Sequence, residues 1–121
     1  MQQAAAQAYQ KTAKQTASPR ELESSLLYKS AGDLQRIRDN WDAAKGELFE
    51  ALTLNRKVWT IFLEHATSAD CHLPPAIQQN IANLGLFVVN HTLKVQTSPA
   101  PGKLDVLINI NREIAAGLRG T

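Results

Sequence analysis

One thiol and three imidazoles are the groups in this 121-residue sequence whose chemistry would suit catalysis or metal binding. The thiol of Cys71 stands between Asp70 and His72 in a polar stretch. Adjacent side chains in a loop do not form a nucleophile–base pair, because such a pair arises from tertiary contact. His65 and His91 fall on apolar faces of helical patterns, where a hydrogen-bonded histidine at the edge of a core is the common role. The sequence therefore predicts no catalytic and no metal-binding role for these residues.

The rest of the sequence adds no catalytic motif. It contains no phosphate-binding glycine loop, no HExxH string and no paired-carboxylate motif. Its single cysteine also excludes an intramolecular disulfide and a cysteine-rich metal scaffold. We therefore expect no enzymatic activity, no cofactor and no small-molecule substrate.

The composition is that of an ordinary small globular domain. Its 44% hydrophobic and 20% charged residues fit one helical domain over residues 1–121. The net charge of +2, from 13 basic and 11 acidic residues, argues against a strong electrostatic nucleic-acid binder but not against a weak one. No leader-like apolar segment opens the chain, and no window approaches the roughly 20 apolar residues of a membrane span. We expect a cytoplasmic protein without membrane insertion.

Recognition of a partner is the function that the segment Asn55–Phe62 indicates. Asn55 occupies a position of an apolar repeat where an apolar residue is expected, and Arg56 precedes Trp59 by three residues, so the two could stack. Two interpretations remain open: a core tryptophan beside an asparagine that fixes register, or a partner-binding face, since tryptophan and arginine are favoured interface anchors. The candidate partner-binding residues are Arg38, Trp41, Asn55, Arg56, Trp59 and Phe62.

A long apolar repeat positions those candidate residues. Ser18, Pro19 and Glu21 form a capping box with proline at the first helical position, which predicts a helix start. From there a heptad pattern runs through residues 19–67. One helix of about 70 Å and two helices broken near Asn40–Asp42 both fit the pattern. The two series of the heptad are Leu27, Leu34, Trp41, Leu48, Asn55 and Phe62, and Ser30, Ile37, Ala44, Ala51, Val58 and His65.

Two later helices and an N-terminal helix complete the predicted fold. After a polar connector at Ser68–Leu73, Pro74–Pro75 open a helix that is apolar over most of its circumference, which is typical of the central helix of a bundle. A loop at Thr97–Gly102 precedes a last amphipathic helix. Residues 1–16, rich in alanine and glutamine, predict an N-terminal helix that could be mobile. The prediction is an all-α fold, a small bundle of four to five helices with one long or broken helix in the region 19–67.

Five strings spread along the chain carry a family resemblance. They are Gln3–Tyr9, Thr16–Glu21, Arg38–Trp41, Asn55–Phe62 and Leu107–Leu118. Each is weak alone, but together and in this order they resemble the FlaF family of bacterial flagellar biosynthesis regulators. The resemblance runs nearly end to end and is least distinctive in the loops.

The resemblance implies a cytoplasmic factor needed for flagellin production. A protein of that family looks like a flagellin-binding secretion chaperone that also acts with the regulator FlbT in post-transcriptional control of flagellin synthesis. The alternative is an RNA-directed translational regulator that reaches flagellin mRNA directly or through FlbT. The family has no catalytic residues to carry over. We expect an amphipathic flagellin helix to dock in a groove along the seam from Trp41 to Phe62, with the N-terminal helix covering or completing that groove.

Overall fold

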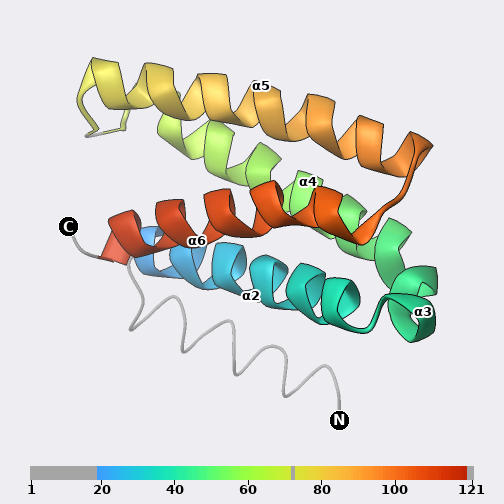
Figure 1. The fold of residues 1–121 in the computed structure, drawn as a ribbon. Helices are drawn as coiled ribbons and strands as arrows, with labels where there is room; N and C mark the ends of the chain where they lie inside the picture. The colour runs from blue at the N-terminus through green and yellow to red at the C-terminus, as the bar shows by residue number, and fades with distance from the viewer. Residues whose placement is uncertain (1–18, 72, 120–121) are drawn as a thin grey trace, which may run out of the picture.

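The computed structural model describes residues 19–71 and 73–119, which form an all-α bundle (Figure 1). This part of the chain contains four long helices, and short helical segments lie in the first and the third of the connections between them. The predicted all-α fold is therefore confirmed, whereas the N-terminal helix predicted for residues 1–16 lies outside the described residues. In chain order the elements are α2 (Pro19–Asp39), α3 (Trp41–Ala44), η1 (Lys45–Glu47), α4 (Leu48–Ala66), α5 (Pro75–Thr97), η2 (Pro101–Leu104) and α6 (Asp105–Arg119).

The heptad region is broken at Asn40, so it does not form one long helix. The backbone of Asn40 leaves the helical conformation with a ψ of 44°, and its amide Nδ2 donates to the carbonyl of Arg36 at 2.9 Å. The chain then turns through α3 and η1. Across this corner Arg36 donates two hydrogen bonds to the Glu47 carboxylate, at 3.0 and 3.2 Å. These bonds hold the pKa of Glu47 below its usual value.

The four long helices run up and down, each antiparallel to the one before it (Figure 1). α6 lies along α2 and makes the most extensive helix–helix contact of the described part, although these two helices are first and last in sequence. α4 packs on α2 and carries α5 on another side. α5 approaches α6 far less closely than it approaches α4.

Polar contacts hold the start of α2 against the end of α6. Near the start of α2, Ser24 Oγ donates to the carbonyl of Ala115 at 2.7 Å in a buried position. One turn further on, the guanidinium of Arg119 lies over the ring of Tyr28, 5.0 Å from its centre. These contacts align the two helices, so their apolar faces meet along most of their length.

The apolar core lies mainly between α2, α4 and α6. The rings of Trp59 and Phe62 pack edge to face in its middle, with centroids 5.5 Å apart. Most positions of the heptad are buried there, although Trp41 is half-buried and His65 is exposed. The largest fully buried apolar side chains are Trp59, Phe62, Leu27, Leu34, Ile37, Leu52, Leu104, Leu107, Ile108, Val88 and Val95.

α5 is not the central helix that its apolar circumference predicted. Val88 and Val95 are completely buried, but Leu86, Phe87 and Leu93 remain 64, 42 and 52% exposed. The prediction was wrong because a helix that is apolar on several sides can still pack on one neighbour only. α5 therefore presents an uncovered apolar surface.

Gly85 shows why α5 lies so close to α4. A Cβ atom at this position would come within 2.5 Å of Leu63 Cδ1 on α4. A larger residue at this position would require the Leu63 side chain to shift, and glycine lets the two helices approach without that shift. The contact fixes which side of α5 faces the bundle, and hence which side faces away.

Candidate functional site

Four polar side chains from three helices meet inside the core. Ser30 of α2 donates to Asn55 Oδ1 at 2.8 Å, and Asn111 Nδ2 of α6 donates to the same oxygen at 2.7 Å. Trp59 Nε1 donates to Asn111 Oδ1 at 2.8 Å. None of the four residues is more than 1% exposed. We call Ser30, Asn55, Trp59 and Asn111 the polar core network; it links α2, α4 and α6 but not α5.

Donor chemistry fixes the direction of the bonds in this network. An indole N–H can only donate, so Asn111 must turn Oδ1 to Trp59 and Nδ2 to Asn55. Asn55 then has to present Oδ1, which leaves its buried Nδ2 without a partner among the described residues. An unpaired buried donor costs free energy. The burial of Asn55 and its bonds to α2 and α6 fit the interpretation in which it fixes the register of the helices, and that role stays a prediction.

Three of the six candidate partner-binding residues lie inside the bundle. Asn55 and Trp59 are completely buried, and Phe62 is 1% exposed. The expected stack of Arg56 on Trp59 is absent, because Arg56 is exposed whereas the indole is enclosed by the core. A partner cannot reach the three buried side chains in the closed bundle. Their role in partner binding stays a prediction, and it requires the helices to separate.

Arg38 is tied down at the surface by two carboxylates. Its Nη1 donates to Asp105 of α6 at 2.8 Å, and its Nε donates to Asp39 at 3.1 Å. These hydrogen bonds, the one to Asp105 first, raise the pKa of Arg38 above its usual value. Arg38 therefore joins α2 to α6, so its guanidinium has a structural role in this conformation.

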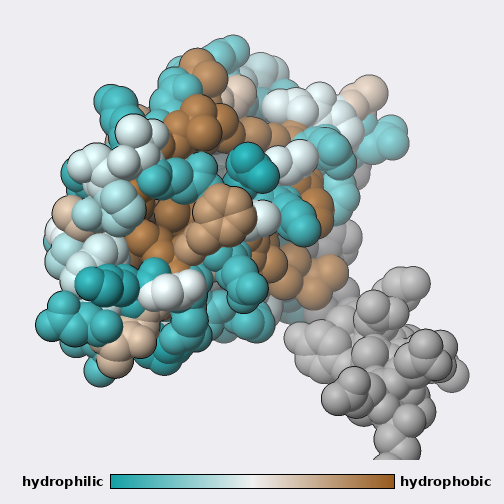
Figure 2. All heavy atoms as spheres, turned by 90° about the vertical axis from the view of Figure 1, so that its right-hand side faces the viewer, coloured by the Kyte–Doolittle hydropathy of each residue, from teal (hydrophilic) through white to brown (hydrophobic). Residues whose placement is uncertain are grey.

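Trp41 lines an open cleft at the end of the bundle that carries α3. The cleft has a volume of about 230 Å³ and lies between α3, the start of α4 and the end of α5. Figure 2 looks onto this end and shows apolar side chains in the middle of the face with polar ones around them. Phe49 is 69% exposed at this site. We call it the α3 cleft; its lining residues are Trp41, Lys45, Leu48, Phe49, Leu52, Gln96 and Pro99.

An exposed apolar stripe continues from the α3 cleft along α5. Gln96 lines the cleft and shares one side of α5 with Leu93, Val89 and Leu86, because helical residues three, four and seven apart lie above one another. The distance along the helix from Leu86 to Gln96 is about 15 Å. We call Leu86, Val89 and Leu93 the α5 stripe. Cleft and stripe together bring surface from α3, α4 and α5 into one region.

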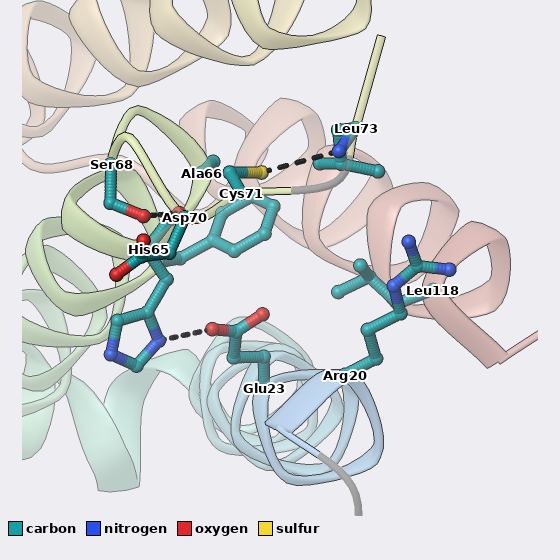
Figure 3. Close-up of a pocket in the computed structure, with 10 residues that line it drawn as sticks. Arg20, Glu23, His65, Ala66, Ser68, Asp70, Cys71, Leu73 and Leu118 are labelled. Carbon is teal, nitrogen blue, oxygen red and sulfur yellow. Dashed lines mark hydrogen bonds and ion pairs between the residues drawn. The ribbon is translucent and has the colours of Figure 1, made fainter.

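A larger cleft lies at the opposite end of the bundle (Figure 3). It has a volume of about 500 Å³. Arg20 and Glu23 come from α2, His65 and Ala66 from α4, and Leu118 from α6, while the connector after α4 closes the remaining side. We call this the N-terminal cleft; its lining residues are Arg20, Glu23, Phe62, His65, Ala66, Ser68, Asp70, Cys71, Leu73 and Leu118.

Three of the groups that could do chemistry, those of His65, His91 and Cys71, make structural contacts, whereas His72 lies outside the described residues. His65 Nδ1 pairs with the Glu23 carboxylate at the rim of the N-terminal cleft. His91 Nε2 donates to the carbonyl of Lys103 at 2.7 Å and so joins α5 to η2. Cys71 Sγ accepts a hydrogen bond from the amide of Leu73. Over residues 19–71 and 73–119, no three histidine, cysteine or acidic side chains gather in a way that could hold a metal ion.

The sequence did not single out the most exposed part of this surface. Phe49 lies outside the heptad, and Leu86 and Leu93 read as a widening of the buried stripe of their helix. The available signal was an apolar surface on α5 larger than one neighbouring helix can cover. Which part stays open depends on the Gly85 contact, which only the folded structure shows.

Comparison with known proteins identifies the family. A family model described as flagellar protein FlaF matches residues 5–118, nearly the whole chain. A search of curated proteins and a search of solved structures each found no match. In the part of the chain that the structure describes, no helix is long and apolar enough to cross a membrane. The all-α bundle and the match over residues 5–118 together lead to one conclusion: the chain belongs to the FlaF family of flagellar proteins.

Proposed function

We propose that this protein binds flagellin as a cytoplasmic secretion chaperone and couples that binding to post-transcriptional control of flagellin synthesis. The observation that supports the proposal is the uncovered apolar surface formed by the α3 cleft and the α5 stripe. Phe49, Leu86 and Leu93 are 69, 64 and 52% exposed on it. Large apolar side chains gathered on an exposed face are typical of interaction sites.

An amphipathic helix is the occupant that this surface fits best. The region from Leu86 to Gln96 is about 15 Å long, which matches about three turns of a helix. A helix of flagellin laid there would place apolar side chains at every third or fourth residue against the α5 stripe. Trp41 and Phe49 supply aromatic area at one end of the surface. Binding of this kind would keep the flagellin helix from assembling before export.

The coupling to translation is proposed to act through a protein partner such as FlbT. Direct RNA binding needs free basic side chains, and two of the arginines in the first half of the chain are already paired. Arg36 bonds to Glu47 and Arg38 bonds to Asp105. Because these ion pairs neutralise both guanidinium groups, we favour a protein-mediated effect on flagellin mRNA.

The test is the affinity for purified flagellin, measured by calorimetry with the double variant Leu86→Gln/Leu93→Gln. Loss of two apolar contacts should weaken binding by about tenfold or more. The melting temperature should stay unchanged, since both side chains are already exposed. Ile61→Gln is the matched control, because Ile61 is also an exposed apolar residue, 44% exposed, but lies on α4 and outside the α5 stripe. Its affinity should equal that of the unsubstituted protein.

Two results would contradict the proposal. Equal flagellin affinity for the double variant and the control would remove the α5 stripe from the binding site. Alternatively, tight binding of flagellin mRNA that falls steeply with salt, with no affinity for flagellin, would favour the RNA-directed function.

A further inference from the structure

The N-terminal cleft has no part in the function proposed above. It lies at the other end of the bundle from the α3 cleft and is about twice as large, at about 500 Å³. Its floor is apolar and includes Ala66, Leu73 and Leu118 (Figure 3). Phe62 also lines it. Such a floor can bind apolar side chains, which come either from another segment of this protein or from a second molecule.

The position of the cleft favours the chain's own N-terminal residues. Arg20, the second residue of α2, is on the rim, so the preceding chain joins the bundle at the edge of the cleft. Ten residues span about 15 Å as a helix and about 33 Å when extended. Residues 4–17 are therefore long enough to cross the cleft from their point of attachment. A segment attached at this point has a high effective concentration at the cleft.

The composition of that segment suits the lining. Six of the first 18 residues are alanine, whose small side chain lets a backbone approach a narrow floor closely. Tyr9 and Ala13, four residues apart, would share one face of a helix. The first 20 residues contain no acidic side chain, and they include Lys11 and Lys14.

The charges on the rim complement those of the segment. Glu23 and Asp70 place two carboxylates at the cleft beside the guanidinium of Arg20, and the carboxylate of Glu23 is paired with His65. Asp70 makes no ion pair with any other described residue. A lysine-bearing segment over this rim would therefore find a carboxylate available. We propose that residues 4–17 dock into the N-terminal cleft of the same molecule, with Tyr9 and Ala13 toward its floor.

The single cysteine of the chain provides a direct test. Cys71 lines the cleft, so a second cysteine in the segment reports docking by forming a disulfide, which requires Cα atoms within about 7 Å. Ala13→Cys and the control Gln15→Cys differ by two residues and would lie on opposite faces of a helix. The full-length variants are oxidised with glutathione disulfide, and the products are followed by mass spectrometry. Ala13→Cys should form an intramolecular disulfide about tenfold faster than Gln15→Cys.

A second measurement does not depend on the geometry that a disulfide between residue 13 and Cys71 would require. Iodoacetamide labelling of Cys71 is compared between the full-length protein and the full-length variant Tyr9→Asp/Ala13→Asp. Docking predicts labelling about fivefold faster in the variant, because two charges on the docked face would expel the segment and expose the thiol. Equal disulfide rates together with equal labelling rates would overturn the proposal. A disulfide-linked dimer as the main product of Ala13→Cys would also overturn it, since the occupant would then come from a second copy.

Discussion

Asn55 shows how one residue can set the arrangement of three helices. It stands at a heptad position that an apolar residue would normally fill, and its Oδ1 accepts from both Ser30 and Asn111. An apolar replacement would leave the Ser30 hydroxyl and the Asn111 amide without this shared acceptor. A helix shifted by one turn would break the same bonds. The polar core network thus selects one register of α2, α4 and α6 among several that would bury similar apolar area.

The network predicts unequal effects for two truncations. Asn111→Ala removes the acceptor of the buried Trp59 N–H, and it should lower the free energy of unfolding by about 1–3 kcal/mol. Ser30→Ala leaves Asn55 Oδ1 with its bond from Asn111, so the loss should be about 0.5–1.5 kcal/mol. Urea unfolding followed by far-ultraviolet circular dichroism measures both. Equal losses would contradict the unequal shares of Asn111 and Ser30 in the network.

At the scale of the elements, the contact between α4 and α5 depends on a missing side chain. Gly85 meets Leu63 where a Cβ would lie 2.5 Å from its Cδ1, whereas Gly32 on α2 has no atom within 4 Å of a Cβ. Both are glycines inside helices, where alanine is otherwise preferred. Alanine substitutions at Gly32 and Gly85 therefore distinguish the effect of helix propensity on stability from the effect of helix packing.

Gly32→Ala should stabilise the protein by roughly 0.5–1 kcal/mol, because it gains helix propensity without a steric cost. Gly85→Ala should give less or none of this stabilisation, since the Leu63 side chain must be displaced or α5 must move outward. Thermal unfolding measures both variants. In a Leu63→Ala background the same Gly85→Ala substitution should become stabilising. If it stabilises the unsubstituted protein as much as Gly32→Ala does, the close α4–α5 contact is incorrect.

The sequence predicts where the helices begin and end better than it predicts which helices pack against one another. Pro19, predicted at the first helical position, is the first residue of α2, whereas Ser18 of the predicted capping box lies outside the described residues. Of the two possibilities that the heptad left open, the structure has the break, at Asn40, whose side chain bonds back to the carbonyl of Arg36. The same local signals cannot show that α5 lies at the side of the bundle. Its apolar residues surround the helix, and the choice of its buried side is made by Gly85 against Leu63.

The same difference between local signals and helix packing applies to the candidate site. The heptad identified Asn55 and Trp59 as unusual, and the structure shows that they act inside the core. Trp41 lines the α3 cleft, but Phe49, Leu86 and Leu93 had no distinguishing pattern in the sequence. An apolar residue in a helix looks the same whether it is buried or exposed, because exposure depends on helices distant in sequence.

At the scale of the whole molecule, packing is uneven. α2, α4 and α6 share the polar core network and most of the buried apolar side chains, whereas α5 packs mainly on α4. A helix with one principal neighbour has fewer contacts to lose when it opens locally. α5 is therefore the least secured of the four long helices in the described part.

Hydrogen exchange should reveal this difference. After correction for intrinsic rates, amides of α5 should exchange about tenfold or more faster than those of α2 and α6. Adding flagellin should slow exchange in α5 more than in α2 if the α5 stripe is the binding surface. Uniform protection across the four helices, measured by mass spectrometry of peptides, would contradict the uneven packing.

The pairing of α2 with α6 has a consequence for the time at which the bundle can form. During translation α2 leaves the ribosome well before the helix that covers it has been made. Leu27, Ala31 and Leu34 have no exposed area in the finished bundle, and α2 packs on α4 as well as on α6, so their full burial waits until α6 has emerged. The nascent chain therefore keeps part of its core incomplete until its last helix is free to pack, and the native core closes only when α6 has left the ribosome.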